Sequence, residues 1–225
     1  LSAALAQFGR DGRNLMRTEI AELAEPFEAE QVASSTMAHK PGNPLNFENT
    51  EGQWIRTKNE FGKVQDTLIS EHQRDLVASC VMRDFPAIPI NVQHQLNTLR
   101  RKTDDGRTFL GRITVNPEAC RVNLQSSSRV LLAEPLYIAL QVAGYEGDAH
   151  EFVMRTLVPR VRKVGGTLIG ELEKLAEEGE ELRGALDRIP ADILDLFSRP
   201  ESYIGSATEQ ALKIADQAEA FVAAA

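Results

Sequence analysis

Residues 34–52 read SSTMAHKPGNPLNFENTEG, and this stretch decides what the rest of the sequence is taken to be. It gathers hydroxyl groups, a histidine, a lysine, asparagines and carboxylates, and no apolar periodicity assigns them to a core. Pro41-Gly42 and Asn43-Pro44 are dipeptides typical of loops. Polar loops on a rigid scaffold are common places for binding and catalysis. Because Ser, Asn, Gly and Pro are also frequent in ordinary turns, a solvated surface loop is the alternative interpretation.

The pattern predicts a loop over residues 31–46 and a long helix over residues 47–70. Asn46 or Asn49 is a candidate N-cap of this helix, because Asn side chains accept hydrogen bonds from the first free backbone N–H groups. Glu48 would lie near the positive end of the helix dipole. Six apolar side chains are the expected packing positions of the helix: Trp54, Ile55, Phe61, Val64, Leu68 and Ile69.

The rest of the chain also predicts helices and almost no strand, so the fold class is all-α. Proline and glycine set the expected ends. Helices are expected over residues 1–30 with an end near Glu25-Pro26, over 76–101 with a break at 85–89, and over 117–143, 147–163, 167–179, a short segment between Pro190 and Pro200, and 207–224. Residues 102–112 are polar and predict a flexible loop, and the charged residues of 171–181 predict a solvated helix face.

Composition excludes several classes of protein. The chain has 225 residues and a formal net charge of −8, which argues against a nucleic-acid surface and requires local clusters of basic residues for any anionic substrate. Cys80 and Cys120 are too few for a disulfide framework or a zinc site, which fits a reducing cytoplasm. The sequence has no apolar run long enough for a transmembrane helix and no signal peptide, so no membrane partner is expected.

A second group of candidate residues is Arg74, Ser79 and Arg83. Ser79 and Arg83 are four residues apart and share a helix face, whereas Arg74 joins them only if it precedes the helix. Two guanidinium groups and a hydroxyl at a helix N-terminus would make a phosphate site. The alternative is a pair of surface arginines bound to nearby acids such as Asp75 and Asp84.

The loop resembles the signature loop of the fumarase/aspartase superfamily, and most closely that of bacterial-type adenylosuccinate lyases. The likeness is carried by Ser34-Ser35-Thr36-Met37-x-His39-Lys40, Asn43-Pro44 and Phe47-Glu48-Asn49-x-Glu51-Gly52. It extends to the flanks at Arg17-Thr18-Glu19-Ile20, Glu25-Pro26-Phe27, Gln73-Arg74-Asp75 through Arg83, and more faintly Leu132-Ala133-Glu134-Pro135.

The resemblance implies the C-terminal half of such an enzyme. Residues 1–116 would be the C-terminal part of a central helical-bundle domain, and residues 117–225 a smaller helical C-terminal domain. The family forms tetramers whose active sites take residues from several subunits. Its general-acid histidine would lie upstream of Leu1, so the 225-residue chain alone is expected to be inactive.

The resemblance also implies the chemistry, a β-elimination that releases fumarate from adenylosuccinate and from the succinyl-aminoimidazole-carboxamide ribotide of purine synthesis. Three residues would be catalytic: Ser35 as the base, Lys40 as the cation beside the developing carbanion, and Glu48 as the partner of a histidine from another subunit. Substrate binding would fall to Ser34, Thr36, Met37, Asn43, Arg74, Ser79 and Arg83. No metal ion or organic cofactor is needed.

Two positions depart from the family pattern. Ala38 stands where proline is usual, and Pro41-Gly42 stands where one residue is usual, which puts the alignment of Asn43 in doubt. Two alternatives therefore remain. The protein is a superfamily relative that acts on another succinyl or carboxylate substrate, or it is a helical assembly module that has lost catalysis.

Overall fold

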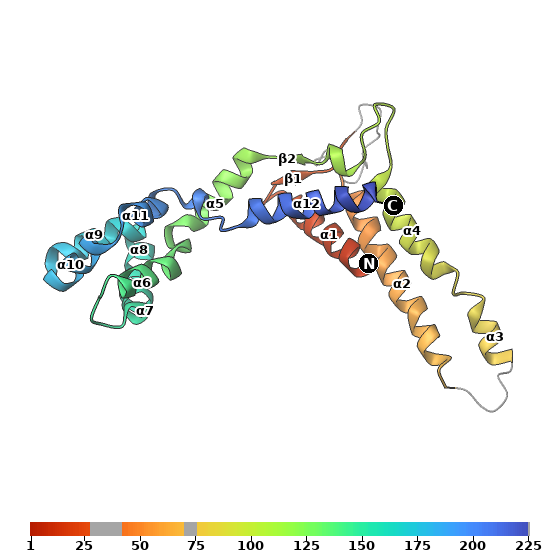
Figure 1. The fold of residues 1–225 in the computed structure, drawn as a ribbon, viewed down its shortest axis with the longest axis horizontal. Helices are drawn as coiled ribbons and strands as arrows, with labels where there is room; N and C mark the ends of the chain where they lie inside the picture. Colours follow the sequence, from red (N-terminus) through yellow and green to blue (C-terminus); the bar gives the residue numbers. More distant parts are fainter. Residues whose placement is uncertain (28–41, 70–75, 225) are drawn as a thin grey trace. The chain divides into compact units, whose positions relative to one another are not determined.

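The computed structural model describes residues 1–27, 42–69 and 76–224 and shows a mainly helical protein (Figure 1). The chain divides into two compact units, Leu1–Arg121 and Val122–Ala225. The described residues contain one two-stranded sheet, and each of its strands has two residues. The all-α fold class is therefore confirmed.

Three helices that pack on one another form the body of the first unit: α1 (Ser2–Leu15), α2 (Leu45–Asp66) and α4 (Ala87–Arg100). Figure 1 shows α2 and α4 running side by side, with the short α3 (Leu76–Met82) near the far end of α2. A 3₁₀ turn, η2 (Leu110–Arg112), follows α4, and α5 (Pro117–Leu131) crosses the boundary between the units.

The N-terminal helix is shorter than the sequence predicts. It ends at Leu15, and the hydrogen-bonded turns that follow contain Ala21 at φ 53°, which an α-helix cannot continue. Residues Leu23–Ala24 then form β1, which pairs antiparallel with β2 (Thr114–Val115). A strand of two residues is too short to show an alternating pattern, and the sequence therefore gives no sign of it.

Close contact between α1 and α2 depends on two glycines of α1. A Cβ at Gly9 would lie 2.7 Å from the backbone oxygen of Phe47, and a Cβ at Gly12 would lie 2.6 Å from its ring. Such distances are far inside van der Waals contact, so only glycine permits this approach. The Phe47 ring is fully buried and lies edge-on to Phe8 and Phe109, with 5.7 Å between ring centroids in each case.

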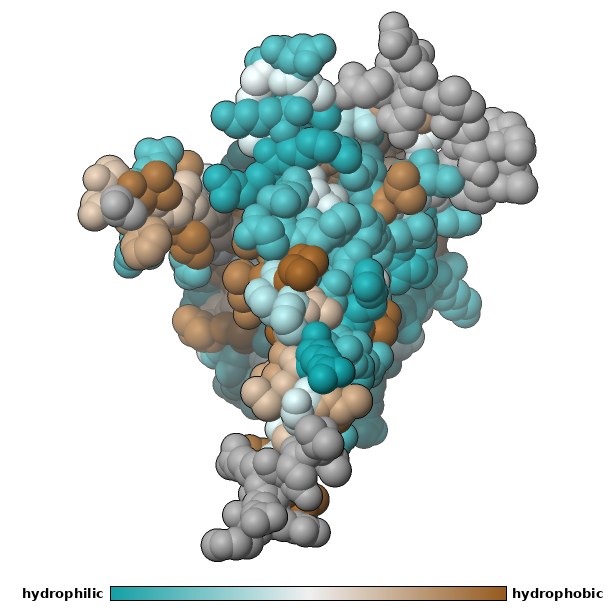
Figure 2. All heavy atoms as spheres, turned by 90° about the vertical axis from the view of Figure 1, so that its right-hand side faces the viewer, coloured by the Kyte–Doolittle hydropathy of each residue, from teal (hydrophilic) through white to brown (hydrophobic). Residues whose placement is uncertain are grey.

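The long helix α2 agrees with the prediction in position but not in its packing face. Its buried residues are Phe47, Thr50 and Thr57. Four of the six predicted packing residues are exposed: Ile55 at 50% and Phe61 at 52% in α2, and Leu68 at 79% and Ile69 at 90% just beyond its end at Asp66. Figure 2 shows apolar side chains, in brown, among hydrophilic ones on the exposed surface. The described residues provide no core for these four side chains.

Prolines place the helix breaks. Pro86 precedes α4, and Pro89 is tolerated in the first turn of α4, where its missing N–H is not needed. Pro135 acts in the same way in α6 (Ala133–Val142), and the predicted helix 117–143 is therefore two helices, α5 and α6, with a break at Leu132. A short π-helical segment, η3 (Val153–Leu157), joins α7 (Ala149–Phe152) to α8 (Val158–Val164), and Pro159 lies in the first turn of α8.

Four more helices complete the second unit. They are α9 (Leu168–Glu178), α10 (Glu180–Arg188), α11 (Ala191–Ser198) and α12 (Ala207–Ala223), with a 3₁₀ turn, η4 (Pro200–Ser202), between the last two. The sequence did not lead us to predict α10, in which Leu182 and Ala185 are buried. The core of this unit is aliphatic and is built from α6 through α10.

Glu171 corrects the prediction that residues 171–181 form a solvated face. Its side chain is 2% exposed and accepts hydrogen bonds from Lys174 Nζ at 2.6 Å and Arg160 Nε at 2.7 Å. These bonds, first from Lys174 and then from Arg160, hold its pKa below the usual range. Glu171 is thus a buried acid that joins α8 to α9.

The contact between Gly12 and Phe47 gives a test of the first unit. Gly12→Ala should lower the free energy of unfolding of this unit by about 1–3 kcal/mol, because the added methyl overlaps the Phe47 ring. Urea unfolding followed by Trp54 fluorescence measures it, since Trp54 is the single tryptophan and lies in α2. Gly62→Ala, which adds a methyl to open space in α2, is the control and should be neutral or stabilising by up to about 1 kcal/mol.

Candidate functional site

The N-terminus of α2 is capped by a carboxylate from far away in the sequence. Glu25 Oε2 accepts hydrogen bonds from the backbone N–H of Asn46 at 3.2 Å and from its Nδ2 at 2.7 Å, and Glu25 Oε1 accepts from the N–H of Phe47 at 2.8 Å. The side chain is buried, with the residue 7% exposed. The helix begins after Pro44, whose side chain cannot accept a hydrogen bond from the backbone N–H groups of the first turn. The predicted caps, Asn46 and Asn49, therefore do not cap α2.

Asn46 connects this N-terminus to α4. Its Oδ1 accepts a hydrogen bond from Arg101 Nη2 at 3.2 Å, just after the end of α4. One turn further along α2, the backbone oxygen of Thr50 accepts from Nε2 of the fully buried Gln95 at 2.8 Å, and Gln95 also bonds Ser2 of α1. The first two turns of α2 are thus fixed to both neighbouring helices.

Glu51 lies on the α1 side of the same region. Its carboxylate binds Arg10 at 2.6 Å and Arg13 at 3.1 Å. The hydrogen bond from Arg10, followed by the charges of Arg13 and Arg10, lowers its pKa. Glu51 is therefore occupied by the scaffold. Glu48, one turn earlier, is exposed and has no side-chain hydrogen bond or ion pair to any described residue, so its carboxylate can receive another group.

The predicted loop residues lie outside the described part of the chain. These are Ser34, Ser35, Thr36, Met37 and Lys40, and Arg74 of the second group is outside it as well. Asn43 is described and is half-buried immediately before α2. The predictions for the undescribed residues remain predictions.

Ser79 and Arg83 lie at α3, and both are exposed. Neither makes a side-chain hydrogen bond or ion pair with any described residue. The alternative that pairs an arginine with Asp84 does not hold for Arg83, because Asp84 binds Lys63 of α2, with Nζ 2.8 Å from Oδ2. The Arg83 guanidinium is available to an anion.

The two ends of α2 keep these groups apart within one chain. Glu48 is in the first turn, whereas Lys63, which holds the segment next to Arg83, is in the last. The fifteen residues between them correspond to about 22 Å along the helix axis. One chain therefore does not bring Glu48 and Arg83 together.

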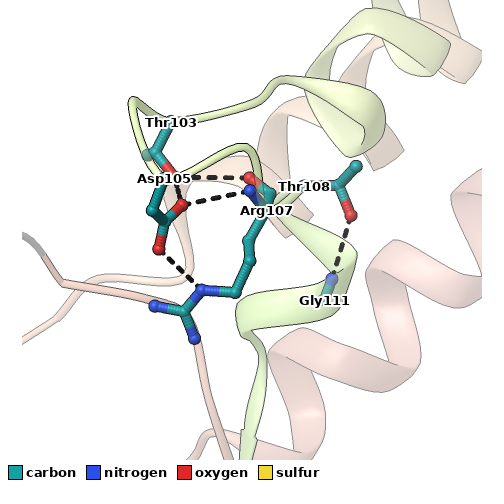
Figure 3. Close-up of polar contacts among 5 residues, drawn as sticks. All are labelled: Thr103, Asp105, Arg107, Thr108 and Gly111. Atoms are coloured by element: carbon teal, nitrogen blue, oxygen red, sulfur yellow. Dashed lines mark hydrogen bonds and ion pairs between the residues drawn. The ribbon is translucent and has the colours of Figure 1, made fainter.

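A tight turn after α4 positions Phe109. In Figure 3 the Asp105 carboxylate accepts bonds from Thr103 Oγ1 at 2.5 Å, from the N–H of Arg107 at 3.0 Å and from Arg107 Nε at 2.6 Å. Gly106, at φ 77°, makes the turn possible. The segment predicted as a flexible loop is thus a hydrogen-bonded turn, and it leads directly to the ring that packs on Phe47.

Within the described part of the chain, neither metal ligands nor histidines form a further site. Residues 1–27, 42–69 and 76–224 contain no group of three or more His, Cys, Asp or Glu that could hold a metal ion. His94 is exposed and shares a hydrogen bond with Asn49, and His150 lies edge-on to Tyr137. None of the described helices is long and apolar enough to cross a membrane.

No protein-family model matches the chain, but curated proteins and solved structures do. Adenylosuccinate lyase of Pyrococcus horikoshii is 32% identical over 224 residues, which are 97% of this chain and 45% of that enzyme. The chain belongs to the fumarase/aspartase superfamily. This superfamily member spans about half the length of the curated relatives it matches.

Other members of the superfamily resemble the chain at similar levels. N-acetyl-S-(2-succino)cysteine lyase of Dickeya dadantii is 27% identical over 93% of the chain and 43% of that enzyme. Among structures, the 3-carboxy-cis,cis-muconate lactonizing enzyme of Pseudomonas putida superposes with a TM-score of 0.72 and 22% identity over 98% of this chain and 45% of that one. This last likeness shows the fold alone.

The pKa of Asp105 provides a pH test of the turn. The hydrogen bond from Thr103, and then those from Arg107, hold its pKa well below the usual range. A carboxylate with a lowered folded pKa stabilises above its unfolded pKa, near 3.8, and this stabilisation is lost as pH falls below that value. Asp105→Asn should therefore destabilise the first unit at pH 7, and the difference from wild type should shrink below pH 4.

Urea unfolding by Trp54 fluorescence between pH 2.5 and 7 measures this difference. Asp104→Asn, in the same turn and exposed, is the control and should follow the wild-type curve. A constant difference between Asp105→Asn and wild type at all pH values would show that the carboxylate charge does not hold the turn.

Proposed function

We propose that the protein containing this chain is a lyase that eliminates fumarate from adenylosuccinate and from the succinyl-aminoimidazole-carboxamide ribotide. The observation that carries the proposal is the 32% identity to an adenylosuccinate lyase across 97% of the chain. The Arg83 guanidinium, which has no ion-pair partner among the described residues, supports it, because both substrates carry a phosphate group. Release of fumarate from either of these two substrates requires cleavage of a C–N bond.

In the proposed reaction Ser35 removes the proton from the carbon next to a succinyl carboxylate. The electron pair left behind is stabilised by fixed positive charge and hydrogen-bond donors, which Lys40 supplies together with Asn43. The pair then forms the new C=C bond while the C–N bond breaks, and a histidine acid protonates the leaving nitrogen. Glu48 holds a histidine from another subunit in this proposal, and its exposed carboxylate, which has no partner among the described residues, supports this role.

Arg74, Ser79 and Arg83 bind the substrate phosphate in this proposal. Ser34, Thr36 and Met37 make further contacts to the substrate. Because the chain has a net charge of −8, such a local group of cations would set where an anion binds. No cofactor takes part in the proposed reaction, and we propose a cytoplasmic location, which fits the free thiols of Cys80 and Cys120.

The proposed enzyme is a homotetramer with shared active sites. Two observations support this assembly: about 22 Å of α2 separate Glu48 from the segment beside Arg83, and the apolar side chains of Phe61 in α2 and of Leu68 and Ile69 just after it are exposed. Packing α2 against copies of itself would bury them. In this arrangement residues 1–116 belong to the central bundle, and residues 117–225 form the C-terminal domain.

A second candidate substrate is a succinylated thiol without phosphate. It is favoured by a relative from Enterococcus italicus, N-acetyl-S-(2-succino)cysteine lyase, which is 37% identical over 156 residues, 68% of this chain. The loop chemistry would be the same, since both reactions would take a proton beside a succinyl carboxylate. The phosphate group separates the two candidates.

A non-catalytic assembly module is the third candidate function, suggested by Ala38 and the extra residue at Pro41-Gly42.

Replacing the proposed base tests whether the protein is an enzyme at all. In the complete protein Ser35→Ala should lower kcat for fumarate release by about 10²–10⁴-fold, because no other group removes the proton. Release is followed by the absorbance of fumarate, and Ser198→Ala, at an exposed serine of α11, serves as the control. The 225-residue chain alone should release none. A Ser35→Ala protein as active as wild type supports the assembly module.

Arg83 decides between the two substrates. Arg83→Ala should raise KM for adenylosuccinate about 10- to 100-fold, because one charge-assisted contact to phosphate is lost, and should leave KM for N-acetyl-S-(2-succino)cysteine unchanged. Arg56→Ala, which removes an exposed arginine from α2, is the matched control. An unchanged KM for the phosphorylated substrate would mean that Arg83 does not bind phosphate.

A further inference from the structure

Glu25 is a buried acid that the proposed reaction does not use. The described residues offer it no ion-pair partner, and its charge is met by three N–H donors, two of them backbone amides. Those amides belong to Asn46 and Phe47, the second and third residues of α2. They are among the N–H groups that a helix leaves unpaired at its N-terminus, where the helix dipole also favours a negative charge.

The contact joins residues that stand on either side of the segment 28–41. Residue 25 closely follows β1, which pairs with β2, and residues 46 and 47 open α2. Since Pro44 gives no side-chain cap, the described residues contain no other side chain that accepts these two amides. Glu25 therefore fixes the first turn of α2 to the β1 strand.

Glu48 is the next residue after Phe47, in the same turn. Its own side chain has no hydrogen bond or ion pair to a described residue, so among those residues only its backbone sets its position. That backbone is held by Glu25 at Asn46 and Phe47, and by Phe47 between Phe8 and Phe109. The packing of the Phe47 ring and the directional hydrogen bonds that Glu25 accepts together restrain this turn.

We propose that Glu25 is a positioning residue for the active site, which acts through the first turn of α2 by setting the orientation of Glu48. The inference rests on the proposed function, because it takes Glu48 as the carboxylate that orients the histidine. A misplacement of about 1 Å at such a group can cost about 100-fold in rate. Glu25 touches neither substrate nor reacting atoms.

Glu25→Gln is the sharpest variant, because it keeps the shape of the side chain. The new amide replaces one acceptor oxygen by a donor that faces a backbone N–H or Asn46 Nδ2. In the complete protein we expect kcat for adenylosuccinate to fall about 10- to 100-fold, with KM within about threefold. Glu25→Asp keeps the charge and both acceptors and should recover part of the rate.

A double-mutant cycle with Glu48→Gln separates positioning from general loss of stability. If Glu25 acts through Glu48, then Glu25→Gln should cause no further loss of kcat once Glu48 has been replaced. Gln95→Leu is the matched structural control, since it removes buried bonds that hold α2 to α1 and α4 one turn away from Glu25. It should lower Tm but change kcat less than about twofold.

The outcomes are distinct. A wild-type protein that releases no fumarate from adenylosuccinate overturns the proposed function. Turnover by wild type together with an unchanged kcat in Glu25→Gln overturns only the role of Glu25. Losses that multiply in the Glu25→Gln, Glu48→Gln double variant also overturn it, because they would show that the two carboxylates act independently.

Discussion

The carboxylate of Glu25 at the N-terminus of α2 is the interaction on which the site region depends. A helix needs acceptors for its first backbone N–H groups, and Pro44 supplies no side-chain cap. The acceptor comes instead from Glu25, beside the short β1–β2 pair, and it binds Asn46 and Phe47 together. This contact places the helix start against residues that are distant in sequence.

Phe47 turns that contact into a packed core. Its ring lies against Gly12 of α1 and its backbone oxygen against Gly9. The ring also packs on Phe109, which follows the Asp105 turn. The same turn of α2 leaves Glu48 exposed, whereas α3 carries Ser79 and Arg83 near the opposite end of the helix. A long rigid helix thus holds two groups of candidate site residues apart, and copies of the chain would be needed to bring such groups together.

Parts of this account could be predicted from the sequence, because they depend on local chemistry or on a long motif. The loop motif predicted the superfamily, and the predicted helix start at residue 47 lies two residues from the observed start of α2 at Leu45. Pro86 correctly marked a helix break. Other features depend on contacts between distant residues. The cap from Glu25, the burial of Glu171 and the two-residue strand β1 have no local signal. Leu68 and Ile69 have the hydropathy of core residues, and the sequence alone does not show that the described residues leave them exposed.

Hydrogen exchange at the amide of Phe47 tests the central claim most directly. In the wild-type protein this amide should be as protected as amides in the middle of α2, since Glu25 accepts its hydrogen bond at 2.8 Å. In Glu25→Gln its exchange should become about 10- to 100-fold faster, while the amide of Thr57 keeps its wild-type rate. A Phe47 amide that exchanges equally fast in both proteins would contradict the account, because the start of α2 would then be held without Glu25.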